Sequence, residues 1–129
     1  MMKGRIKQPL GDLFGINNFG VNLTRLSPGA RSALLHRHKL QEEFIYILEG
    51  EPVLVTDVEE IQLRSGMCAG FIPEGRAHQL VNRTSSDVLY LEVGDRTQGD
   101  EVTYPVDDLV AVSSSDNQWT FTHKNGKPY

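Results

Sequence analysis

Hydrophobic residues in this chain are grouped in short runs, several of which alternate with polar residues. The runs are rich in β-branched and aromatic side chains: "FGVNLTRL", "EFIYIL", "PVLVTD", "HQLVN" and "DVLYLEV". Twelve glycines and six prolines interrupt them at short intervals. No window sustains an apolar period of 3.6 residues, so we expect no long helix. The pattern predicts an all-β sandwich or barrel.

Turn signals mark where the predicted strands end. "SPGA" at 27–30, "LEGEP" at 48–52 and "PEGRA" at 73–77 carry the glycines and prolines of tight turns. After them, "GDRTQGDEV" predicts a loop, "VDDLVAV" suits either a helical turn or a short strand, and "WTFT" suits a terminal strand. The length fits one domain. We expect a single domain over residues 1–129, with a core at about 18–95 and a polar loop and tail at 96–129.

The segment "EFIYILEG" is apolar on both faces of its predicted strand. Ile45 and Ile47 point to one face, and Phe44 and Tyr46 point to the other. A strand that is apolar on two sides must be covered on two sides. The second cover could be an N-terminal strand, the aromatic tail or another subunit. We therefore expect a homodimer.

Charge and composition exclude several classes of partner. The 13 basic and 17 acidic residues give a formal net charge of -4, which argues against binding of nucleic acid. We interpret the basic cluster "MKGRIK" as a solvated terminus. No stretch approaches the roughly 18 apolar residues of a membrane-spanning helix, and no apolar run follows the first charges. One cysteine excludes an internal disulfide. We expect a cytoplasmic protein without a membrane partner.

Two histidines and a glutamate precede the apolar run "FIYIL". His36 and His38 share one face of a strand, roughly 6–7 Å apart. Glu43 is an odd number of positions after His38, so on one uninterrupted strand the two side chains would face opposite sides. We therefore expect a bend in "KLQE" that turns Glu43, and not Glu42, inward. His78 begins the strand after the turn "PEG" and can complete the set if its face lines the same interior. Imidazole and carboxylate suit a divalent transition metal, namely Fe, Mn, Ni, Co, Cu or Zn.

Each of these residues also has a simpler interpretation. A single histidine is more often a surface residue or a satisfied interior residue than a ligand. Three further side chains are candidates for contact with a substrate: Arg25, Tyr46 and Tyr90. Arg25 could meet an anionic group at the barrel mouth, and the alternative is a surface arginine at a strand end. For the two tyrosines, the alternative is packing in the core.

Two spaced motifs resemble those of the cupin superfamily. The first is "GARSALLHRHKLQEEFIYILEG", which carries Gly29, His36, His38, Glu43 and Gly50. The second is "GMCAGFIPEGRAHQLVN", which carries Gly66, Pro73, Gly75, His78 and Asn82. Each has a spacer one residue longer than the usual pattern. The motifs span residues 29 to 82, and the end of the chain is similar to small single-domain bacterial cupins.

The resemblance implies a double-stranded β-helix, the jelly-roll barrel of cupins. It also implies one divalent metal held inside the barrel by His36, His38, Glu43 and His78. Four protein ligands would leave two octahedral positions open for a small, oxygen-rich metabolite. The implied enzyme is an oxygenase, isomerase, decarboxylase or lyase, with Glu43 as a ligand that could also act as a base. The alternatives are a sensor that binds a small molecule without turnover, and a storage role.

Overall fold

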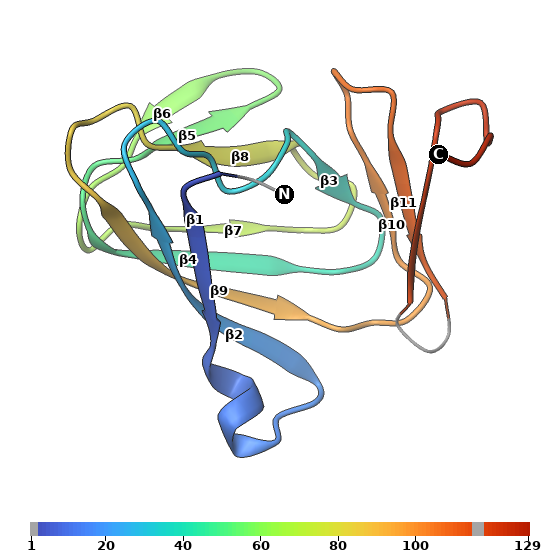
Figure 1. Cartoon of the computed structure of the whole chain (residues 1–129), viewed down its shortest axis with the longest axis horizontal. Helices are drawn as coiled ribbons and strands as arrows, with labels where there is room; N and C mark the ends of the chain where they lie inside the picture. The colour runs from blue at the N-terminus through green and yellow to red at the C-terminus, as the bar shows by residue number, and fades with distance from the viewer. Residues whose placement is uncertain (1–2, 115–117) are drawn as a thin grey trace.

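The computed structural model describes residues 3–114 and 118–129, and these residues form an almost entirely β structure (Figure 1). The elements are β1 (Arg5–Pro9), the 3-10 helix η1 (Leu10–Phe14), β2 (Phe19–Leu26), β3 (Arg37–His38), β4 (Glu43–Glu49), β5 (Val53–Thr56), β6 (Glu60–Gln62), β7 (Cys68–Phe71), β8 (His78–Val81), β9 (Val88–Asp95), β10 (Glu101–Thr103), β11 (Val110–Ser113) and β12 (Trp119–Thr122). The predicted all-β jelly-roll fold is confirmed. Among the described residues, no helix is long and apolar enough to cross a membrane.

The strands form two layers that enclose a barrel. The first layer is a five-stranded antiparallel sheet in the order β1-β2-β9-β4-β7. A three-stranded sheet, β6-β5-β8, lies on the opposite side, and a four-stranded sheet, β12-β11-β10-β3, stands at one end (Figure 1). Two isolated bridges join the segment before β3 to β8, Arg31 with Val81 and His36 with His78. The segment that carries the first two histidines therefore lies beside the strand that carries the third.

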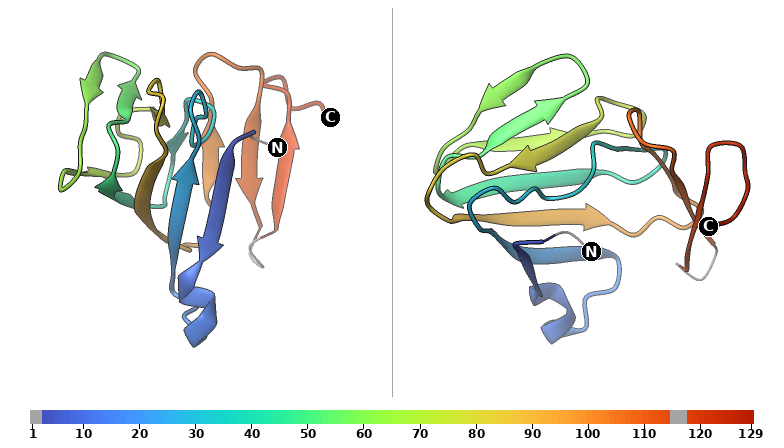
Figure 2. Two further views of the ribbon diagram at one scale, coloured as in Figure 1. Left: turned by 60° about the vertical axis from the view of Figure 1, so that its left-hand side comes forward. Right: turned by 45° about the horizontal axis from the view of Figure 1, so that its top comes forward.

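The C-terminal strands stand at one end of the barrel, next to β3 (Figures 1 and 2). We expected residues 96–129 to be a loop and tail, and their described part contains β10, β11 and β12; the undecided segment "VDDLVAV" leads into β11. Val102 and Ala111 are buried where β10 pairs with β11. This sheet extends the barrel wall and borders the opening of the interior.

The core lies between the layers and is built from alternate residues of each strand. The buried cluster comprises Leu26, Ala30, Ile45, Ile47, Leu54, Leu63, Leu80, Val88 and Tyr90. The opposite face of β4 is open: Phe44 is 41% and Tyr46 39% exposed. The two apolar faces expected for β4 are therefore present, and only the inner face is buried within the described chain.

Candidate metal centre

Three strands bring the predicted histidines and glutamate together. His36 lies just before β3, His38 ends β3, and Glu43 begins β4 after a bend at residues 39–42. Because of this bend, the side chains of His38 and Glu43 face the same interior. His78 begins β8, and its backbone N–H donates to the carbonyl of His36 at 2.8 Å. The hydrogen-bonded pairing holds these two histidine rings 4.6 Å apart.

The four side chains converge on one carboxylate oxygen. Glu43 Oε1 lies 3.5 Å from Nε2 of His36, 2.9 Å from Nε2 of His38 and 3.1 Å from Nε2 of His78. The ligand atoms of His36, His38 and Glu43 all lie within 4.8 Å of one another. The four side chains are between 8% and 19% exposed, so the cluster is largely shielded from water.

The opposite ring nitrogens of two histidines are held by backbone carbonyls. His36 Nδ1 is 2.8 Å from the carbonyl oxygen of Leu34, and His78 Nδ1 is 3.3 Å from that of Arg76. A carbonyl only accepts hydrogen bonds, so each Nδ1 must carry the proton. In a neutral imidazole, Nε2 then has no proton and carries a free lone pair. This is the arrangement in which histidine binds a metal through Nε2.

His38 is oriented by a buried carboxylate. Its Nδ1 lies 2.6 Å from Oδ2 of Asp100, which is fully buried. The other oxygen of Asp100 accepts hydrogen bonds from the backbone N–H groups of Leu40 and Gln41, at 2.7 and 3.3 Å. Asp100 thus connects the bend after β3 to the histidine ring. Asp100 could not be predicted from the sequence, because a single aspartate in a polar segment carries no signal until the fold places it.

The chemistry of this donor set fits a divalent cation. Three imidazole lone pairs and a carboxylate oxygen point at one another, and such a cluster repels itself unless positive charge lies among them. Protons on the Nε2 atoms would require doubly protonated imidazoles. A divalent metal satisfies all four groups with the imidazoles neutral. Nitrogen and oxygen donors of this kind suit the first-row metals from manganese to zinc.

Electrostatic interactions within the cluster favour a protonated His38 and an ionised Glu43 when no metal is bound. Burial lowers the pKa of His38, but hydrogen bonds with Glu43 and Asp100 and the charges of these carboxylates outweigh burial and raise it to about 9. Burial also opposes the charged form of Glu43. In the absence of a metal, hydrogen bonds from the Nε2 groups of the three histidines outweigh this effect and hold the pKa of Glu43 well below its usual value. Glu43 is therefore ionised at neutral pH, as a metal ligand must be, and its low pKa makes it a weak general base.

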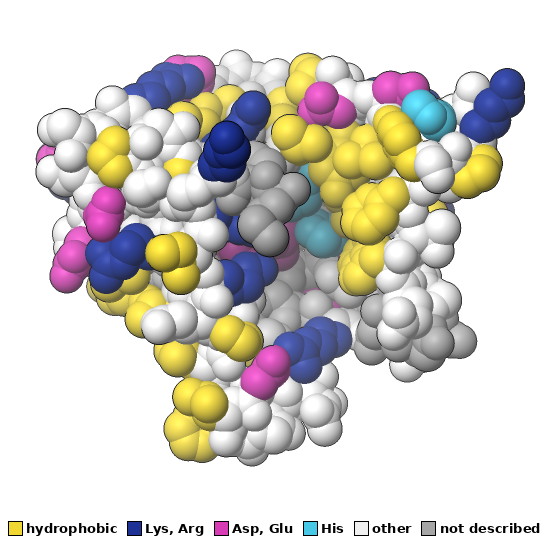
Figure 3. All heavy atoms as spheres, in the orientation of Figure 1, with side chains coloured by type: hydrophobic (Ala, Val, Ile, Leu, Met, Phe, Trp, Pro, Cys, Tyr) yellow, Lys and Arg dark blue, Asp and Glu magenta, His cyan; other side chains and the backbone are white. Residues whose placement is uncertain are grey.

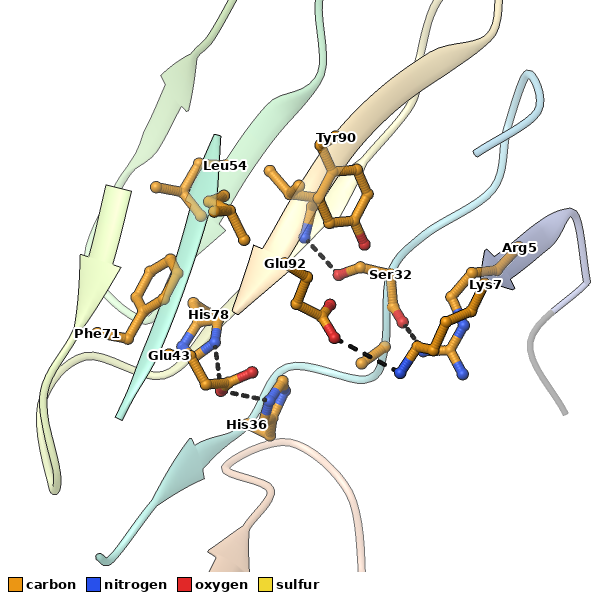
Figure 4. Close-up of a pocket in the computed structure, with 13 residues that line it drawn as sticks. Arg5, Lys7, Ser32, His36, Glu43, Leu54, Phe71, His78, Tyr90 and Glu92 are labelled. Atoms are coloured by element: carbon orange, nitrogen blue, oxygen red, sulfur yellow. Dashed lines mark hydrogen bonds and ion pairs between the residues drawn. The ribbon is translucent and has the colours of Figure 1, made fainter. Parts of the chain in front are cut away.

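A cavity of about 170 Å³ extends from the cluster into the barrel. Figure 4 shows His36, Glu43 and His78 at one end, Arg5 and Lys7 at the other, and Glu92 between them. Hydrophobic side chains line the remaining wall, Leu54 and Phe71 among them.

A wider cleft of about 660 Å³ adjoins the cavity, and both are lined by Arg5, Lys7, Ala33 and His36. The cleft is bordered on its far side by aromatic residues of the C-terminal segment, namely Tyr104, Trp119 and Phe121. Figure 3 shows a hollow with basic side chains on one side, hydrophobic side chains on the other and histidine between them.

Strand register explains how the charged residues reach the cavity. Lys7, Thr24 and Tyr90 are paired across β1, β2 and β9, so they share the inner face. Glu92 lies one pleat further along β9, and Glu43 on β4 is paired one pleat beyond it. Glu92 was not predicted from the sequence, and the expectation of a solvated terminus at "MKGRIK" did not place Lys7 in a pocket. The i, i+2 spacing of the basic residues in β1 was the available signal.

The three expected substrate residues have different positions. Tyr90 lines the cavity and is fully buried. Arg25 does not line it, because its guanidinium forms an exposed ion pair with Asp87 at 3.4 Å. Tyr46 lies on the outer face of β4 and is 39% exposed. The structure therefore places only Tyr90 where a substrate in the cavity could reach it.

Comparison with known proteins defines the class to which the fold and site belong. A sequence profile of the cupin domain matches residues 22–94, which include all four clustered side chains. This chain belongs to the cupin family. No curated protein sequence is similar enough to this chain to count as a match.

Solved structures resemble the chain over most of its length. A cupin-superfamily sugar phosphate isomerase from Silicibacter pomeroyi is 41% identical, with a TM-score of 0.93 over 99% of this chain and 82% of its own. A candidate sugar phosphate isomerase from Acidithiobacillus ferrooxidans is 26% identical, with a TM-score of 0.88 over 97% and 80%. A polyketide cyclase from Streptomyces resistomycificus is 25% identical, with a TM-score of 0.64 over 73% and 66%.

Proposed function

We propose that this chain is a metal-dependent isomerase that acts on a small sugar phosphate. The observation that carries the proposal is the convergence of three histidine Nε2 atoms on Glu43 Oε1, with each Nδ1 held by an acceptor. This geometry supports a metal bound by His36, His38, Glu43 and His78. The substrate class is supported by the likeness to the Silicibacter pomeroyi isomerase, which extends over 99% of the chain.

A bound divalent metal would supply Lewis-acid chemistry, polarising a carbonyl or hydroxyl oxygen of the sugar. The protein must then move a proton between neighbouring carbon atoms. Isomerisation of this kind needs no oxidant or reductant, because the proton removed from one carbon is returned to the next. The chain therefore needs one base that reaches the cavity and does not hold the metal.

Glu92 meets this requirement. Its carboxylate lies in the cavity between the donor cluster and β1 (Figure 4). It is held by an ion pair with Lys7 at 3.5 Å and by a hydrogen bond from Asn22 at 3.4 Å. These contacts orient the carboxylate without enclosing it, since its side chain remains 21% exposed. We assign to Glu92 the role of proton carrier that the sequence analysis had considered for Glu43.

The test separates metal binding from turnover. Protein purified without added metal would be analysed for its metal content and then incubated anaerobically with sugar phosphates in deuterated water. We expect deuterium at the exchanged carbon, detected by NMR. Glu92→Gln should keep the metal and lose about 100-fold or more in exchange rate. His36→Ala should lose both metal and exchange.

Glu60→Gln is the matched control, because Glu60 also forms an ion pair but lies on the surface, far from the cavity. It should exchange at the rate of the unmodified protein. Full metal content in both His36→Ala and His78→Ala would overturn the assignment of the site. Tight binding of sugar phosphates without any exchange would instead favour a non-catalytic binding protein.

We also propose that the chain forms a homodimer through the outer face of the five-stranded sheet. This face carries Phe44 and Tyr46 on β4, and the paired strand β9 presents Leu91 and Val93 beside them. Leu23 of β2 continues the same apolar surface. A second copy offers an identical apolar face, and stacking of the two sheets would cover both.

A further inference from the structure

We propose that Arg5, Lys7 and the hydroxyl of Tyr90 form an anion-binding subsite for the phosphate of the substrate. The subsite lies at the opposite end of the cavity from the clustered histidines (Figure 4). The inference deepens the proposed function and rests on it for the identity of the substrate. The presence of an anion subsite can be tested without turnover.

Arg5 supplies a positive charge that no carboxylate neutralises. Its guanidinium donates a hydrogen bond to the backbone carbonyl of Ser32. In the part of the chain that the structure describes, no acidic side chain lies within ion-pair distance of Arg5. The residue is half-buried at the cavity wall, where water screens its charge less than at an open surface. A guanidinium in this position is well suited to bind phosphate.

Tyr90 supplies a buried hydroxyl at the cavity wall. The residue is fully buried, and its hydroxyl lies beside that of Thr24, its cross-strand neighbour. Within the described structure, neither hydroxyl makes a hydrogen bond of ordinary geometry. Burial raises the pKa of Tyr90 above its usual value, so the hydroxyl keeps its proton at neutral pH. A hydrogen bond between these two hydroxyls uses only one of their two O–H donors. Buried polar groups are nearly always paired, so the remaining donor indicates a missing acceptor. The ring directs this hydroxyl toward the end of the cavity that holds Ser32 and Arg5 (Figure 4).

Lys7 completes the subsite. It projects from the same face of β1 as Arg5, because the two residues are separated by one position along the strand. Its ammonium pairs with Glu92 at 3.5 Å, and its side chain is 38% exposed, so it retains donors for a second partner. Glu92 balances one of the two positive charges of β1. The excess positive charge at this end favours a phosphate over a neutral group.

The position of the subsite restricts the substrate. The metal donors and the cationic residues occupy opposite ends of one cavity, with the carboxylate of Glu92 between them. A substrate that reaches both ends must carry its phosphate away from the carbon atoms that react. The subsite therefore selects terminal phosphomonoesters of linear or ring-opened sugars, with the reacting oxygens at the other end of the molecule.

The test uses inorganic phosphate and chelator-treated protein, so that no metal contributes to binding. Phosphate binding would be measured by isothermal titration calorimetry. Arg5→Gln and Lys7→Gln should each weaken binding about tenfold or more, because each removes charge-assisted hydrogen bonds. Arg64→Gln and Lys124→Gln remove exposed charges elsewhere and serve as controls. They should leave phosphate binding unchanged.

Tyr90→Phe tests whether weaker phosphate binding could come from a loss of stability instead of the loss of a phosphate contact. This variant keeps the ring and removes only the hydroxyl, so the free energy of unfolding should not fall. Phosphate binding should nevertheless weaken several-fold. Unchanged phosphate affinity in Arg5→Gln, Lys7→Gln and Tyr90→Phe would overturn the subsite, even if the protein isomerises sugar phosphates. Weakened binding in these variants without any isomerisation would leave the subsite standing and remove the proposed reaction.

Discussion

At the scale of single residues, the donor cluster depends on groups that never touch the metal position. Asp100 is the clearest case, since it accepts from His38 Nδ1 and from two backbone N–H groups at once. Its burial makes these hydrogen bonds strong and costly to lose. The tautomer of His38 is therefore set by a residue 62 positions away in the sequence.

Asp100→Asn tests this role. The amide is the same size as the carboxylate but presents an N–H₂ group to His38 when its oxygen keeps the backbone hydrogen bonds. His38 would then carry its proton on Nε2 and lose its lone pair for the metal. We expect metal affinity to fall about 10- to 100-fold, measured by competition with a chromophoric chelator. Asp87→Asn, on the exposed ion pair with Arg25, is the control; an equal loss there would contradict the role of Asp100.

The raised pKa of His38 predicts how stability depends on pH in the metal-free protein. The folded pKa of about 9 exceeds the unfolded value of 6.5. Its contribution is therefore fully present below pH 6.5 and is lost as the pH rises through 9. We expect the free energy of unfolding to fall by an amount on the order of 2 kcal/mol between these values, measured by urea denaturation.

His38→Gln is the comparison for this experiment, since it removes the titrating group and should flatten the profile between pH 6.5 and 9. The metal-loaded protein should show the opposite trend. Protons compete with the metal for the imidazole nitrogens, so stability should decline as the pH falls. A profile identical in His38→Gln and the unmodified protein would show that another group causes the dependence.

At the scale of elements, the turn after β4 fixes where this central strand ends. Gly50 has a φ of +92°, a conformation that side chains with a Cβ rarely adopt. A Cβ at this position would also lie 2.9 Å from the carbonyl oxygen of Asp87, just before β9. The close approach of the turn to β9 helps to hold β4 in the register that aims Glu43 inward.

Gly50→Ala should therefore destabilise the protein for two reasons. The strained backbone costs about 1–3 kcal/mol, and the steric conflict with Asp87 adds to it. Gly66→Ala separates the two effects, because Gly66 has a similar φ of +90° but open space around its Cβ position. Urea unfolding should show a larger loss for Gly50→Ala. Equal losses would mean that the contact with Asp87 is relieved without cost.

At the scale of the whole molecule, the outer face of the five-stranded sheet predicts self-association. Sedimentation velocity should show a dimer, and Phe44→Arg should shift it to the monomer, because a charge at the centre of an apolar interface cannot be solvated there. A stable interface of standard size buries about 800 Å² per partner. Val58→Arg places the same charge at a different exposed site and should leave the dimer intact. A monomeric unmodified protein would exclude the interface.

The sequence by itself determined a large part of this protein. Alternation in "EFIYIL" assigned Ile45 and Ile47 to the interior, and both are buried. The bend expected between His38 and Glu43 is present, so the two residues face the same interior. These features are local: side chains alternate across a strand, and turn residues mark where it ends.

Only the tertiary structure decided which distant residues share the cavity. The pairing of β1 with β2, and of β2 with β9, carried Lys7 to the row that contains Tyr90. The C-terminal strands brought Asp100 to His38. Periodicity gives the face on which a side chain lies but not the neighbour of its strand. Strand neighbours are set by long-range pairing and packing of the whole barrel, which no single segment encodes.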